Sequence, residues 1–418
     1  MESLLKSALS GLVVRGALEL QTASGKRWLF GNGSEPEIGV RFVDAAAQRA
    51  FLFDPELKLG ELFMDQRLLV ERGSIYDFLY LLLDNARDSA PSPLLAAIDR
   101  LRFATRRWRQ RNDPRRALRN VAHHYDLGEP LYDLFLDSDR QYSCAYFETP
   151  EQSLEDAQLA KKRHIAAKLR VGPGDKVLDI GCGWGGLAMY LAEVAGADQV
   201  LGITLSKEQR ATAEARAAER GLGRQVVFSL TDYRHQDGEF DRIVSVGMFE
   251  HVGLGYYDTY FRNCRRLLRD DGLMLLHTIG CSGPPSHANP WLDRYIFPGG
   301  YLPTLSEMMP AIERAGLIVT DIEVLRLHYA STLRAWRERF MARRAEAARL
   351  YDERFCRMWE FYLAFCEAAF RCEDVVVFQL QLATRNDSVP LTRHYIAERE
   401  QALKTEEQRR RASSSNVP

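Results

Sequence analysis

From residue 171 onward, short apolar runs alternate with longer stretches in which apolar residues recur every three or four positions. The first pattern predicts buried strands and the second predicts amphipathic helices. The predicted strands cover residues 176–182, 199–205, 225–232, 240–247, 273–280, 317–325 and 374–385. The predicted helices cover residues 186–197, 206–221, 256–269 and 306–316, with a longer helical stretch at 331–372. This alternation is typical of an α/β fold with a mostly parallel sheet covered by helices on both faces.

A smaller α/β unit is predicted before this region. It combines an alternating hairpin pattern, one more strand and two helical patterns, at residues 16–33, 37–44, 45–65 and 74–86. The stretch SAPSP at 89–93 is typical of a linker. We therefore predict four segments: an N-terminal domain over 1–95, an arginine-rich linker or helix over 96–120, a main domain over 121–395 and a disordered tail over 396–418.

Composition narrows the class of protein. The chain has 418 residues, of which 46% are apolar and 27% charged, so it can bury a sizeable core. Its net charge of -1 argues against bulk nucleic-acid binding. Seven cysteines without a CxxC pair favour reduced thiols in a cytoplasmic protein. The first residues are too short and polar for a signal peptide, and no apolar run approaches the roughly 18 residues of a membrane helix. Any contact with a membrane is therefore expected from the water side.

One segment departs from this neutral balance. Residues 99–120 contain nine arginines and almost no acidic residues. Two interpretations stay open at this point. The segment is either a solvated helix face or a patch for anionic head groups, with Phe103 and Trp108 as interfacial anchors.

A glycine-rich turn follows the first strand of the main domain, in the stretch VLDIGCGWGG at 177–186. Gly181, Gly183 and Gly185 allow a tight turn and a close approach of the backbone to a ligand. The spacing D-x-G-x-G-x-G differs from the G-x-G-x-x-G of dinucleotide folds and is typical of S-adenosylmethionine (SAM) loops. The alternative is a purely structural turn between a strand and a helix.

The neighbouring strands supply further candidates for cofactor contacts. SAM enzymes of this fold mostly carry an acid at the end of the second strand, for the ribose hydroxyls, whereas this chain has Thr204, Leu205 and Ser206. Gln209 is a candidate to take over the ribose contacts. Asp232 and Tyr233, after the third strand, are candidates for the adenine edge. The missing acid indicates a subgroup of these enzymes.

His123, His124 and Asp126 raise the question of a metal. Adjacent histidines point in different directions on any regular element, so they do not share a ligand easily. We expect no metal site.

Several motifs together resemble the cyclopropane fatty acid synthases and the related mycolic acid methyltransferases. The motifs are HHYDLG (123–128), QYSCAYF (141–147), VLDIGCGWGG, GITLSKEQ (202–209), DRIVSVGMFEHVG (241–253), LHTIG (276–280), YIFPGGYLP (295–303), HYASTLRAW (328–336) and FYLAFCEAAFR (361–371). The resemblance covers residues 120–385 and implies a class I SAM-dependent methyltransferase with a Rossmann-like, mostly parallel seven-stranded sheet. The first hundred residues resemble the family's smaller N-terminal lipid-binding domain.

The resemblance also implies roles for individual residues. SAM contacts would come from Tyr142, Ser143, Asp179, Gly181, Gly183, Gly185, Thr204, Leu205, Gln209, Asp232 and Tyr233. A bicarbonate ion would be held by Cys144, Glu250, His277, the backbone at Ile279, and Tyr329. Taken singly, these last residues have simpler interpretations: a small buried thiol, a helix-terminal acid beside a surface His251, a core histidine and a packing tyrosine.

The implied reaction needs such residues. An isolated alkene is a poor nucleophile, so the protein must align the double bond with the sulfonium methyl group of SAM and exclude water. Attack leaves a carbocation, and a base must remove a proton before a ring can close. The resemblance implies that the chain is a cyclopropane-fatty-acyl-phospholipid synthase, which adds a methylene group to a cis double bond of an unsaturated phospholipid acyl chain.

The expected partners are this lipid substrate and an anionic bilayer surface contacted through 100–119, at the inner face of the membrane. A homodimer is a further possibility, and nucleic acid is not expected. Three alternatives stay open. They are a fatty acid methyltransferase with a methyl-branched or methylene product, a methyltransferase for a small soluble molecule, and a lipid-binding protein without activity.

Overall fold

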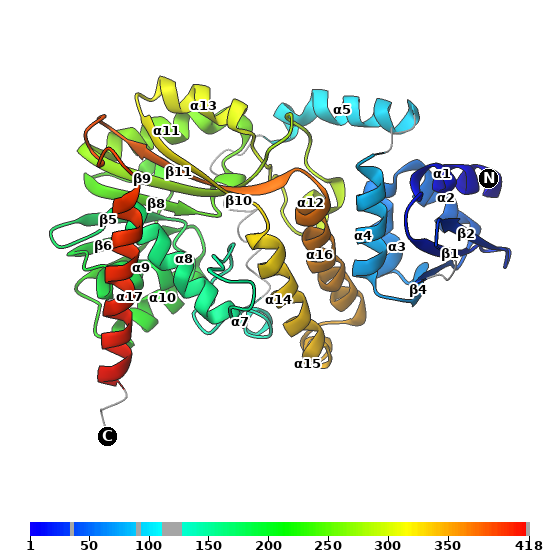
Figure 1. Cartoon of the computed structure of the whole chain (residues 1–418), viewed down its shortest axis with the longest axis horizontal. Coiled ribbons are helices and arrows are strands. Elements are labelled where there is room, and N and C mark those ends of the chain that lie inside the picture. Colours follow the sequence, from blue (N-terminus) through cyan, green and yellow to red (C-terminus); the bar gives the residue numbers. More distant parts are fainter. Residues whose placement is uncertain (34–36, 89–92, 111–127, 415–418) are drawn as a thin grey trace.

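The computed structural model describes residues 1–33, 37–88, 93–110 and 128–414, which form two sheets of different size (Figure 1). The smaller sheet has the strand order β2-β1-β3-β4. Its strands are β1 (Ala17–Gln21), β2 (Arg27–Gly31), β3 (Ile38–Phe42) and β4 (Leu68–Arg72). The predicted hairpin is present, because β1 and β2 pair antiparallel with Ala17 opposite Gly31. The helices of this unit are α1 (Glu2–Leu12), α2 (Ala45–Phe53), α3 (Pro55–Met64) and α4 (Ile75–Ala86).

The larger sheet has seven strands in the order β10-β11-β9-β8-β5-β6-β7. They are β5 (Lys176–Ile180), β6 (Gln199–Thr204), β7 (Val226–Leu230), β8 (Phe240–Val246), β9 (Leu268–Cys281), β10 (Ile318–Leu325) and β11 (Val375–Ala383). The five strands from β9 to β7 run parallel, and β11 pairs antiparallel with both β9 and β10. The predicted α/β fold with a mostly parallel sheet is therefore confirmed.

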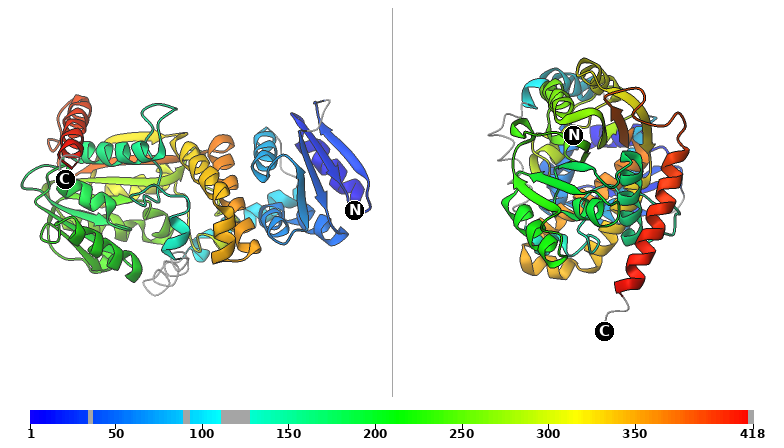
Figure 2. Two further views of the ribbon diagram at one scale, coloured as in Figure 1. Left: turned by 90° about the horizontal axis from the view of Figure 1, so that it is seen from below. Right: turned by 90° about the vertical axis from the view of Figure 1, so that its left-hand side faces the viewer.

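Helices cover both faces of this sheet, and each face has its own apolar core (Figure 2). One core contains buried residues of α8 (Leu154–Leu169), α9 (Gly186–Glu193), α10 (Lys207–Glu219) and α17 (His394–Ser414). The other contains residues of α11 (Tyr257–Leu267) and α13 (Leu305–Arg314). The β5 strand contributes alternately to the two cores, Val177 to the first and Leu178 to the second, because successive side chains point to opposite faces.

A third core joins the two units. The stretch predicted as one long helix is three helices, α14 (His328–Ala342), α15 (Arg344–Leu350) and α16 (Glu353–Cys372), and α16 packs against α3 and α4. At Gly60 of α3, an added Cβ atom would lie 2.3 Å from the indole nitrogen of Trp291 in α12 (Pro290–Tyr295). The glycine thus allows close contact between the units, and the small unit shares its core with the large one.

The arginine-rich segment is partly a helix, α5 (Pro93–Arg109), while residues 111–127, including His123, His124 and Asp126, lie outside the described residues. Arg102 binds Glu56 (2.6 Å) and Asp54 (2.9 Å), both on the small unit. Arg106 stacks on the Phe103 ring at 3.5 Å and pairs with Glu307 of α13 at 3.7 Å. The interpretation of this segment as a solvated face is therefore wrong for these two arginines, which hold α5 against its neighbours.

The predicted disordered tail is wrong for residues up to 414. Helix α17 packs along α8, with Leu403 and Glu407 buried. Glu407 accepts hydrogen bonds from Arg163 (2.9 and 3.1 Å) and from the Tyr190 hydroxyl (2.7 Å). The polar composition of this stretch predicted disorder because composition alone does not show that Glu407 is the partner of the buried Arg163.

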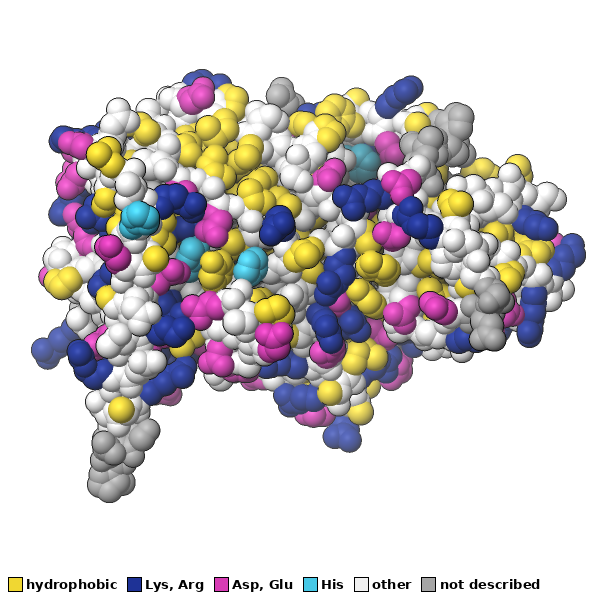
Figure 3. Space-filling view, in the orientation of Figure 1, with side chains coloured by type: hydrophobic (Ala, Val, Ile, Leu, Met, Phe, Trp, Pro, Cys, Tyr) yellow, Lys and Arg dark blue, Asp and Glu magenta, His cyan; other side chains and the backbone are white. Residues whose placement is uncertain are grey.

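Acidic and basic side chains are interspersed over the face seen in Figure 3, in keeping with the near-zero net charge. Within the described part of the chain, none of the helices combines the length and the apolar character that crossing a bilayer requires.

The buried ion pair of α17 gives a stability prediction. Glu407→Gln removes one of the two carboxylates that bind Arg163, the other being Glu148 at 3.0 Å. It should lower the free energy of unfolding by roughly 2 kcal/mol, because a buried charge loses its two hydrogen bonds to Glu407. Urea unfolding measures this loss. Glu406→Gln is the matched control: its ion pairs with Arg409 and Arg410 lie at the surface, so its effect should stay below about 0.5 kcal/mol. Equal effects of the two substitutions would contradict the docking of α17.

Candidate active site

A pocket lies at the carboxyl ends of β5, β6, β7 and β8, where ligands bind in open α/β sheets. The glycine turn forms one wall. Gly181, Gly183 and Gly185 all have left-handed backbones, with φ of +86°, +53° and +81°, which other residues rarely adopt. The amides of Gly181 and Cys182 both donate to the Ile203 carbonyl of β6, which fixes the turn beside the second strand.

All but one of the predicted cofactor residues line this pocket. The lining includes Tyr142, Ser143, Asp179, Gly181, Gly183, Thr204, Leu205, Gln209, Asp232 and Tyr233. Gly185 lies behind the wall, where an added Cβ atom would come within 2.6 Å of the Phe228 ring. Its role is to let helix α9 begin close to the sheet. Around Gly183 there is open space, since an added Cβ atom would meet nothing within 4 Å.

The end of β6 presents a neutral hydrogen-bonding pair where related folds carry an acid. The Thr204 hydroxyl donates to the Gln209 side-chain oxygen at 3.1 Å. The Ser206 hydroxyl caps the N-terminus of α10 by accepting a hydrogen bond from the backbone amide of Gln209 at 3.2 Å. The side chains of Thr204 and Gln209 are therefore fixed at the pocket wall, and neither adds a negative charge.

Asp232 begins the short 3-10 helix η1 (Tyr233–His235). Burial raises its pKa, but hydrogen bonds from Arg234 (2.5 and 2.8 Å) outweigh burial and hold the pKa below its usual range. Tyr233 packs edge-on against Tyr260, with ring centroids 5.2 Å apart. Asp232 is therefore an ionised acceptor in a rigid position.

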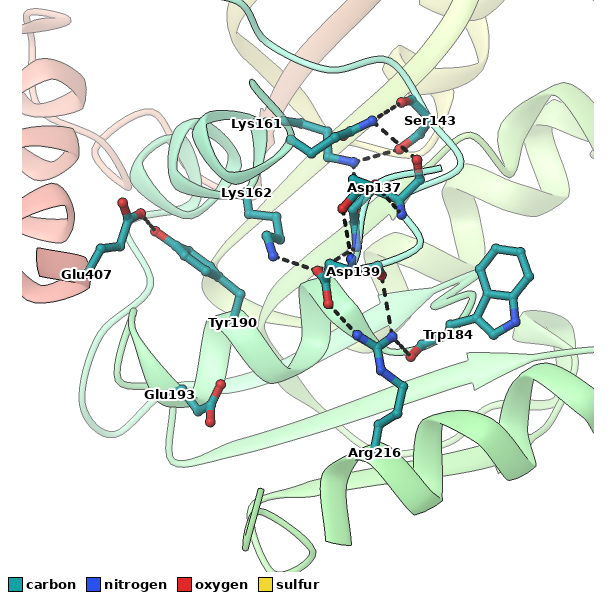
Figure 4. Close-up of polar contacts among 12 residues, drawn as sticks. Asp137, Asp139, Ser143, Lys161, Lys162, Trp184, Tyr190, Glu193, Arg216 and Glu407 are labelled. Carbon is teal, nitrogen blue, oxygen red and sulfur yellow. Dashed lines mark hydrogen bonds and ion pairs between the residues drawn. The ribbon is translucent and has the colours of Figure 1, made fainter. Parts of the chain in front are cut away.

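The segment that closes the pocket from outside the sheet has neither helix nor strand between 133 and 150, and buried polar contacts hold it (Figure 4). Asp139 binds Lys162 (2.5 Å) and Arg216. Lys161 donates to the Gln141 side chain (2.7 Å) and to the Ser143 hydroxyl (2.8 Å). These contacts fix Gln141 and Ser143 against α8.

The aromatic residues of QYSCAYF are fixed as well. The Tyr142 hydroxyl lies 2.9 Å from that of Tyr362 in α16, and its ring stacks on Trp336 of α14 with centroids 5.2 Å apart. Tyr146 stacks between His164 (4.3 Å) and His328 (4.9 Å). The segment is thus held from both domain-joining helices and from α8.

Asp179, at the end of β5, is buried, and its Oδ2 has no hydrogen-bond partner among the described residues. Burial raises its pKa to about 7, and the nearby positive charge of Lys161 acts in the opposite direction. The pocket therefore has a buried carboxyl group at its floor that can still accept a hydrogen bond.

Glu250 lies in the short 3-10 helix η2 (Phe249–His251), which is followed by η3 (Leu254–Tyr256). Its Oε1 accepts a hydrogen bond from the Ile279 amide at 2.6 Å, so two of the predicted catalytic positions are in direct contact. Its Oε2 is buried and has no partner among the described residues. Burial raises the pKa of Glu250 to about 7.

The remaining predicted catalytic residues, Cys144, His277 and Tyr329, are also buried. His277 lies on β9 two residues before Ile279, and its Nδ1 is 3.2 Å from the side-chain nitrogen of Gln379 on β11. Burial lowers the pKa of His277 well below its usual value, so the ring is neutral. Cys144 and Tyr329 belong to one apolar cluster against which Ile279 packs. Burial raises the pKa of the Cys144 thiol, which stays protonated.

Sequence reasoning missed His251. The interpretation of this residue as a surface histidine is wrong, because it lines the pocket and burial lowers its pKa to about 4. Its position beside Glu250 in GMFEHVG was the available signal.

One group of described residues, Glu56, Asp99 and His287, places three ligand-type atoms within 4.8 Å of one another. The Arg102 guanidinium lies 2.6 Å from Glu56 and 3.9 Å from Asp99. The group is therefore an ion-pair network that links α3, α5 and the loop before α12, with its positive charge already supplied by arginine.

Comparisons with known proteins cover this whole region. The family model described as "Mycolic acid cyclopropane synthetase" matches residues 112–380. The chain is 40% identical over 349 residues to the cyclopropane-fatty-acyl-phospholipid synthase of Escherichia coli (strain K12), covering 84% of this chain and 88% of that protein. It is 44% identical over 269 residues to a probable fatty acid methyltransferase of Pseudomonas putida, covering 63% and 68% of the two chains.

Among solved structures, mycolic acid cyclopropane synthase CmaA1 complexed with SAH and CTAB matches with a TM-score of 0.59 and 35% identity. This match covers 64% of the present chain and 98% of that chain. The predicted methyltransferase class of the fold is therefore confirmed, and the chain carries a further unit beyond the part that it shares with this structure.

The buried Glu250 predicts a pH-dependent stability. The folded state keeps its proton up to about pH 7, whereas the unfolded state loses it near the ordinary pKa of 4.5, so this contribution to stability is lost as the pH rises through 7. Glu250→Gln does not titrate. It should therefore gain stability relative to the wild type between pH 5 and 8, by about 3 kcal/mol at most.

Urea unfolding at pH 5 and pH 8 measures this gain. Glu239→Gln, at an exposed position, is the control and should show no pH-dependent gain. A gain of the same size at both pH values would mean that Glu250 is not buried as a protonated acid.

Proposed function

Because the chain belongs to the mycolic acid cyclopropane synthetase family and is a SAM-dependent methyltransferase, we propose that it forms cyclopropane rings in phospholipids. It would transfer a methylene group from SAM to a cis double bond of an unsaturated phospholipid acyl chain. The observation that carries this proposal is the 40% identity to the Escherichia coli phospholipid synthase over 84% of the chain, which extends beyond the catalytic region.

The pocket fits SAM as the methyl donor. The open space at Gly183 leaves room beside the backbone, and the relative CmaA1 was solved with SAH. We assign the ribose contacts to Thr204 and Gln209, whose hydroxyl and amide can bond hydroxyl groups in place of an acid. Asp232 and Tyr233 would face the adenine, and Tyr142, Ser143 and Asp179 would line the methionine part.

The reaction itself is simple in its bond changes. The electron pair of the double bond forms a bond to the donor methyl carbon while the carbon–sulfur bond breaks, which leaves a carbocation on the acyl chain. Loss of one proton from the transferred methyl group closes the ring. The protein has to hold the double bond in line, exclude water and accept that proton.

The residues at the end of β9 fit a small oxyanion. A bound bicarbonate would supply the base for the proton. The unpartnered Oε2 of Glu250 is free to bond it, and a Glu250 with its pKa raised to about 7 can do so as a protonated donor. Neutral His277, the protonated thiol of Cys144, Tyr329 and the Ile279 carbonyl, which can accept from the bicarbonate hydroxyl, would complete the set, since the Ile279 amide already donates to Glu250. None of these groups has to become a strong base itself.

The apolar side of the site suits a carbocation on a lipid chain. Tyr132, Phe135, Tyr142, Trp336 and Trp359 form a contiguous set of ring contacts with centroids 5.2 to 6.5 Å apart. Ring faces attract cations, and apolar walls exclude water. Of these rings only Tyr142 lines the pocket, and the other four are buried against one another, so Tyr142 is the ring of this set that would face the cation.

A second product is possible from the same carbocation. The 44% identity to a probable fatty acid methyltransferase favours a variant with a methyl-branched or methylene-bearing product. Proton loss from a neighbouring chain carbon would leave a methyl-branched alkene, and a 1,2-hydride shift followed by loss of a methyl proton would leave a methylene group. A saturated methyl branch would need a separate reductant.

The first test is incubation with SAM and vesicles of unsaturated phospholipid, followed by mass spectrometry and proton NMR of the fatty acids. We expect acyl chains that have gained CH2, lost the double bond and show cyclopropane ring protons. A gain of CH2 with an olefinic signal would indicate the methylene product. Acyl chains that stay unchanged would overturn the proposal.

Glu250→Gln should lower turnover in this assay by roughly 10²-fold, since it weakens the group that positions the proton acceptor. Its SAM affinity, measured by calorimetry, should stay within about threefold of the wild type. The exposed Glu239→Gln should match the wild type in both measurements. A collapse of SAM affinity in Glu250→Gln would show that our role for this residue is wrong.

We further propose that α5 and the small unit dock on the bilayer. Leu101 and Phe103 of α5 are exposed, by 68% and 37%, although the helix is otherwise tied to its neighbours by arginines. The double substitution Leu101→Ser with Phe103→Ser should weaken binding to anionic vesicles roughly tenfold and leave SAM binding unchanged.

Vesicle co-sedimentation at low salt measures this loss. Leu391→Ser removes an apolar side chain that is even more exposed, at 105%, from a distant part of the chain and should bind vesicles like the wild type. Equal binding by all three proteins would place the docking surface elsewhere.

A further inference from the structure

Lys161, on α8, is a completely buried ammonium group with no carboxylate in hydrogen-bond contact among the described residues. The acids whose charges act on it are Asp137, whose own pKa burial raises, and Asp139, which is already paired with Lys162 and Arg216. The Lys161 Nζ donates to the Gln141 side-chain oxygen at 2.7 Å and to the Ser143 hydroxyl at 2.8 Å, both neutral acceptors (Figure 4). Among the described residues, no carboxylate oxygen lies within 4.0 Å of this nitrogen. Its buried neighbours differ: Lys162 pairs with Asp139, and Lys168 pairs with Glu323 and Asp321.

Burying an ammonium group that has no carboxylate in contact costs free energy, so the presence of Lys161 at this position needs an explanation. Burial lowers the pKa of Lys161 to about 8, which still leaves it mostly protonated at neutral pH. An ammonium group has three N–H donors, and the two hydrogen bonds above use two of them. One donor and one unit of positive charge therefore remain for a further group.

The position of Lys161 relates it to the end of β9. Ser143, which it binds, is followed directly by Cys144, and the charge of Lys161 acts on Cys144, on His277 and on Asp179. The groups assigned above to the oxyanion are a protonated thiol, a neutral imidazole, a tyrosine, a backbone carbonyl and a carboxylic acid. None of them brings a positive charge to a buried anion.

We propose that Lys161 is a positioning residue that supplies the positive charge balancing a small oxyanion beside Cys144 and His277. This inference rests on the proposed function, because it concerns the anion assigned to the same site. It extends that proposal by naming the residue whose positive charge offsets the free-energy cost of burying an anion, in place of a metal or an arginine.

A competing role is local. Asp179 is buried with an unpartnered Oδ2, and Lys161 is the charged residue that acts on it. If Lys161 served only to balance Asp179, its loss would change the SAM pocket and leave anion binding unaltered. The two roles therefore differ in which ligand responds to the substitution.

The test uses Lys161→Met, which keeps length and removes charge, and Lys161→Arg, which keeps charge. Lys162→Met is the matched control, a neighbouring buried lysine whose charge is already paired. In buffers depleted of carbon dioxide, bicarbonate is titrated against each protein, and the rise in Tm gives its apparent Kd. SAM affinity is measured by calorimetry and turnover with unsaturated vesicles.

We expect Lys161→Met to weaken bicarbonate binding at least roughly tenfold, as for loss of a buried charge partner, while SAM affinity changes less than about threefold. Lys161→Arg should recover much of the bicarbonate response, and Lys162→Met should keep it. If Lys161→Met does not fold, Lys161→Gln takes its place, because it removes the charge but keeps a hydrogen-bond donor for Gln141 and Ser143. It should show the same weakened bicarbonate response, whereas Lys161→Arg and Lys162→Met should not.

The contrary outcomes are distinct. If the wild type responds to bicarbonate and the Lys161 variants respond equally, the role of Lys161 is wrong and the proposed function stands. If SAM affinity falls while the bicarbonate response is unchanged, Lys161 serves Asp179 instead. If the wild type itself shows no rise in Tm with bicarbonate, both the anion and this role of Lys161 are overturned, whereas SAM-dependent ring formation is judged separately by the fatty acid analysis.

Discussion

The burial of an irregular polar segment is the constraint on which this active site depends. Residues 133–150 have neither helix nor strand, yet they lie between the large sheet and the helices that join the two units. Those of their polar groups that are buried must find hydrogen-bond partners. Side chains of α8 provide these partners, and Gln158 adds two hydrogen bonds to the carbonyls of Gln141 (3.2 Å) and Ser143 (3.0 Å). The pocket has a fixed wall because this requirement is met.

The same burial sets the chemistry of the site. Groups that would be charged in water are pushed toward their neutral forms: Glu250 and Asp179 have pKa values raised to about 7, and the pKa of His277 is lowered. Neutral donors can hold an anion without repelling a cationic methyl donor or a carbocation. Burial thus costs stability and prepares the site for a reaction between a sulfonium and an alkene.

Much of the fold could be read from the sequence, because periodicity reports local burial directly. The strands of the large sheet lie where their apolar runs predicted, and the spacing of Gly181, Gly183 and Gly185 predicted a turn at the pocket. The tail was a failure of the same reasoning. Its charged composition predicted disorder, whereas Glu407 binds Arg163, a residue 244 positions earlier in the chain. Composition describes the average solvation of a segment and says nothing of one specific long-range partner.

The sequence by itself determined which candidate functional groups follow one another along the chain. These are a glycine turn, a neutral end of the second strand, and the motifs that contain Cys144, Glu250 and His277. Only the tertiary structure decided which of these groups touch and which are charged. The Glu250–Ile279 contact joins residues 29 positions apart. That Lys161 contacts two neutral acceptors and no carboxylate oxygen follows only from the placement of the surrounding side chains. The physical reason is that protonation and electrostatic balance depend on distances across the fold, which local residue patterns do not encode.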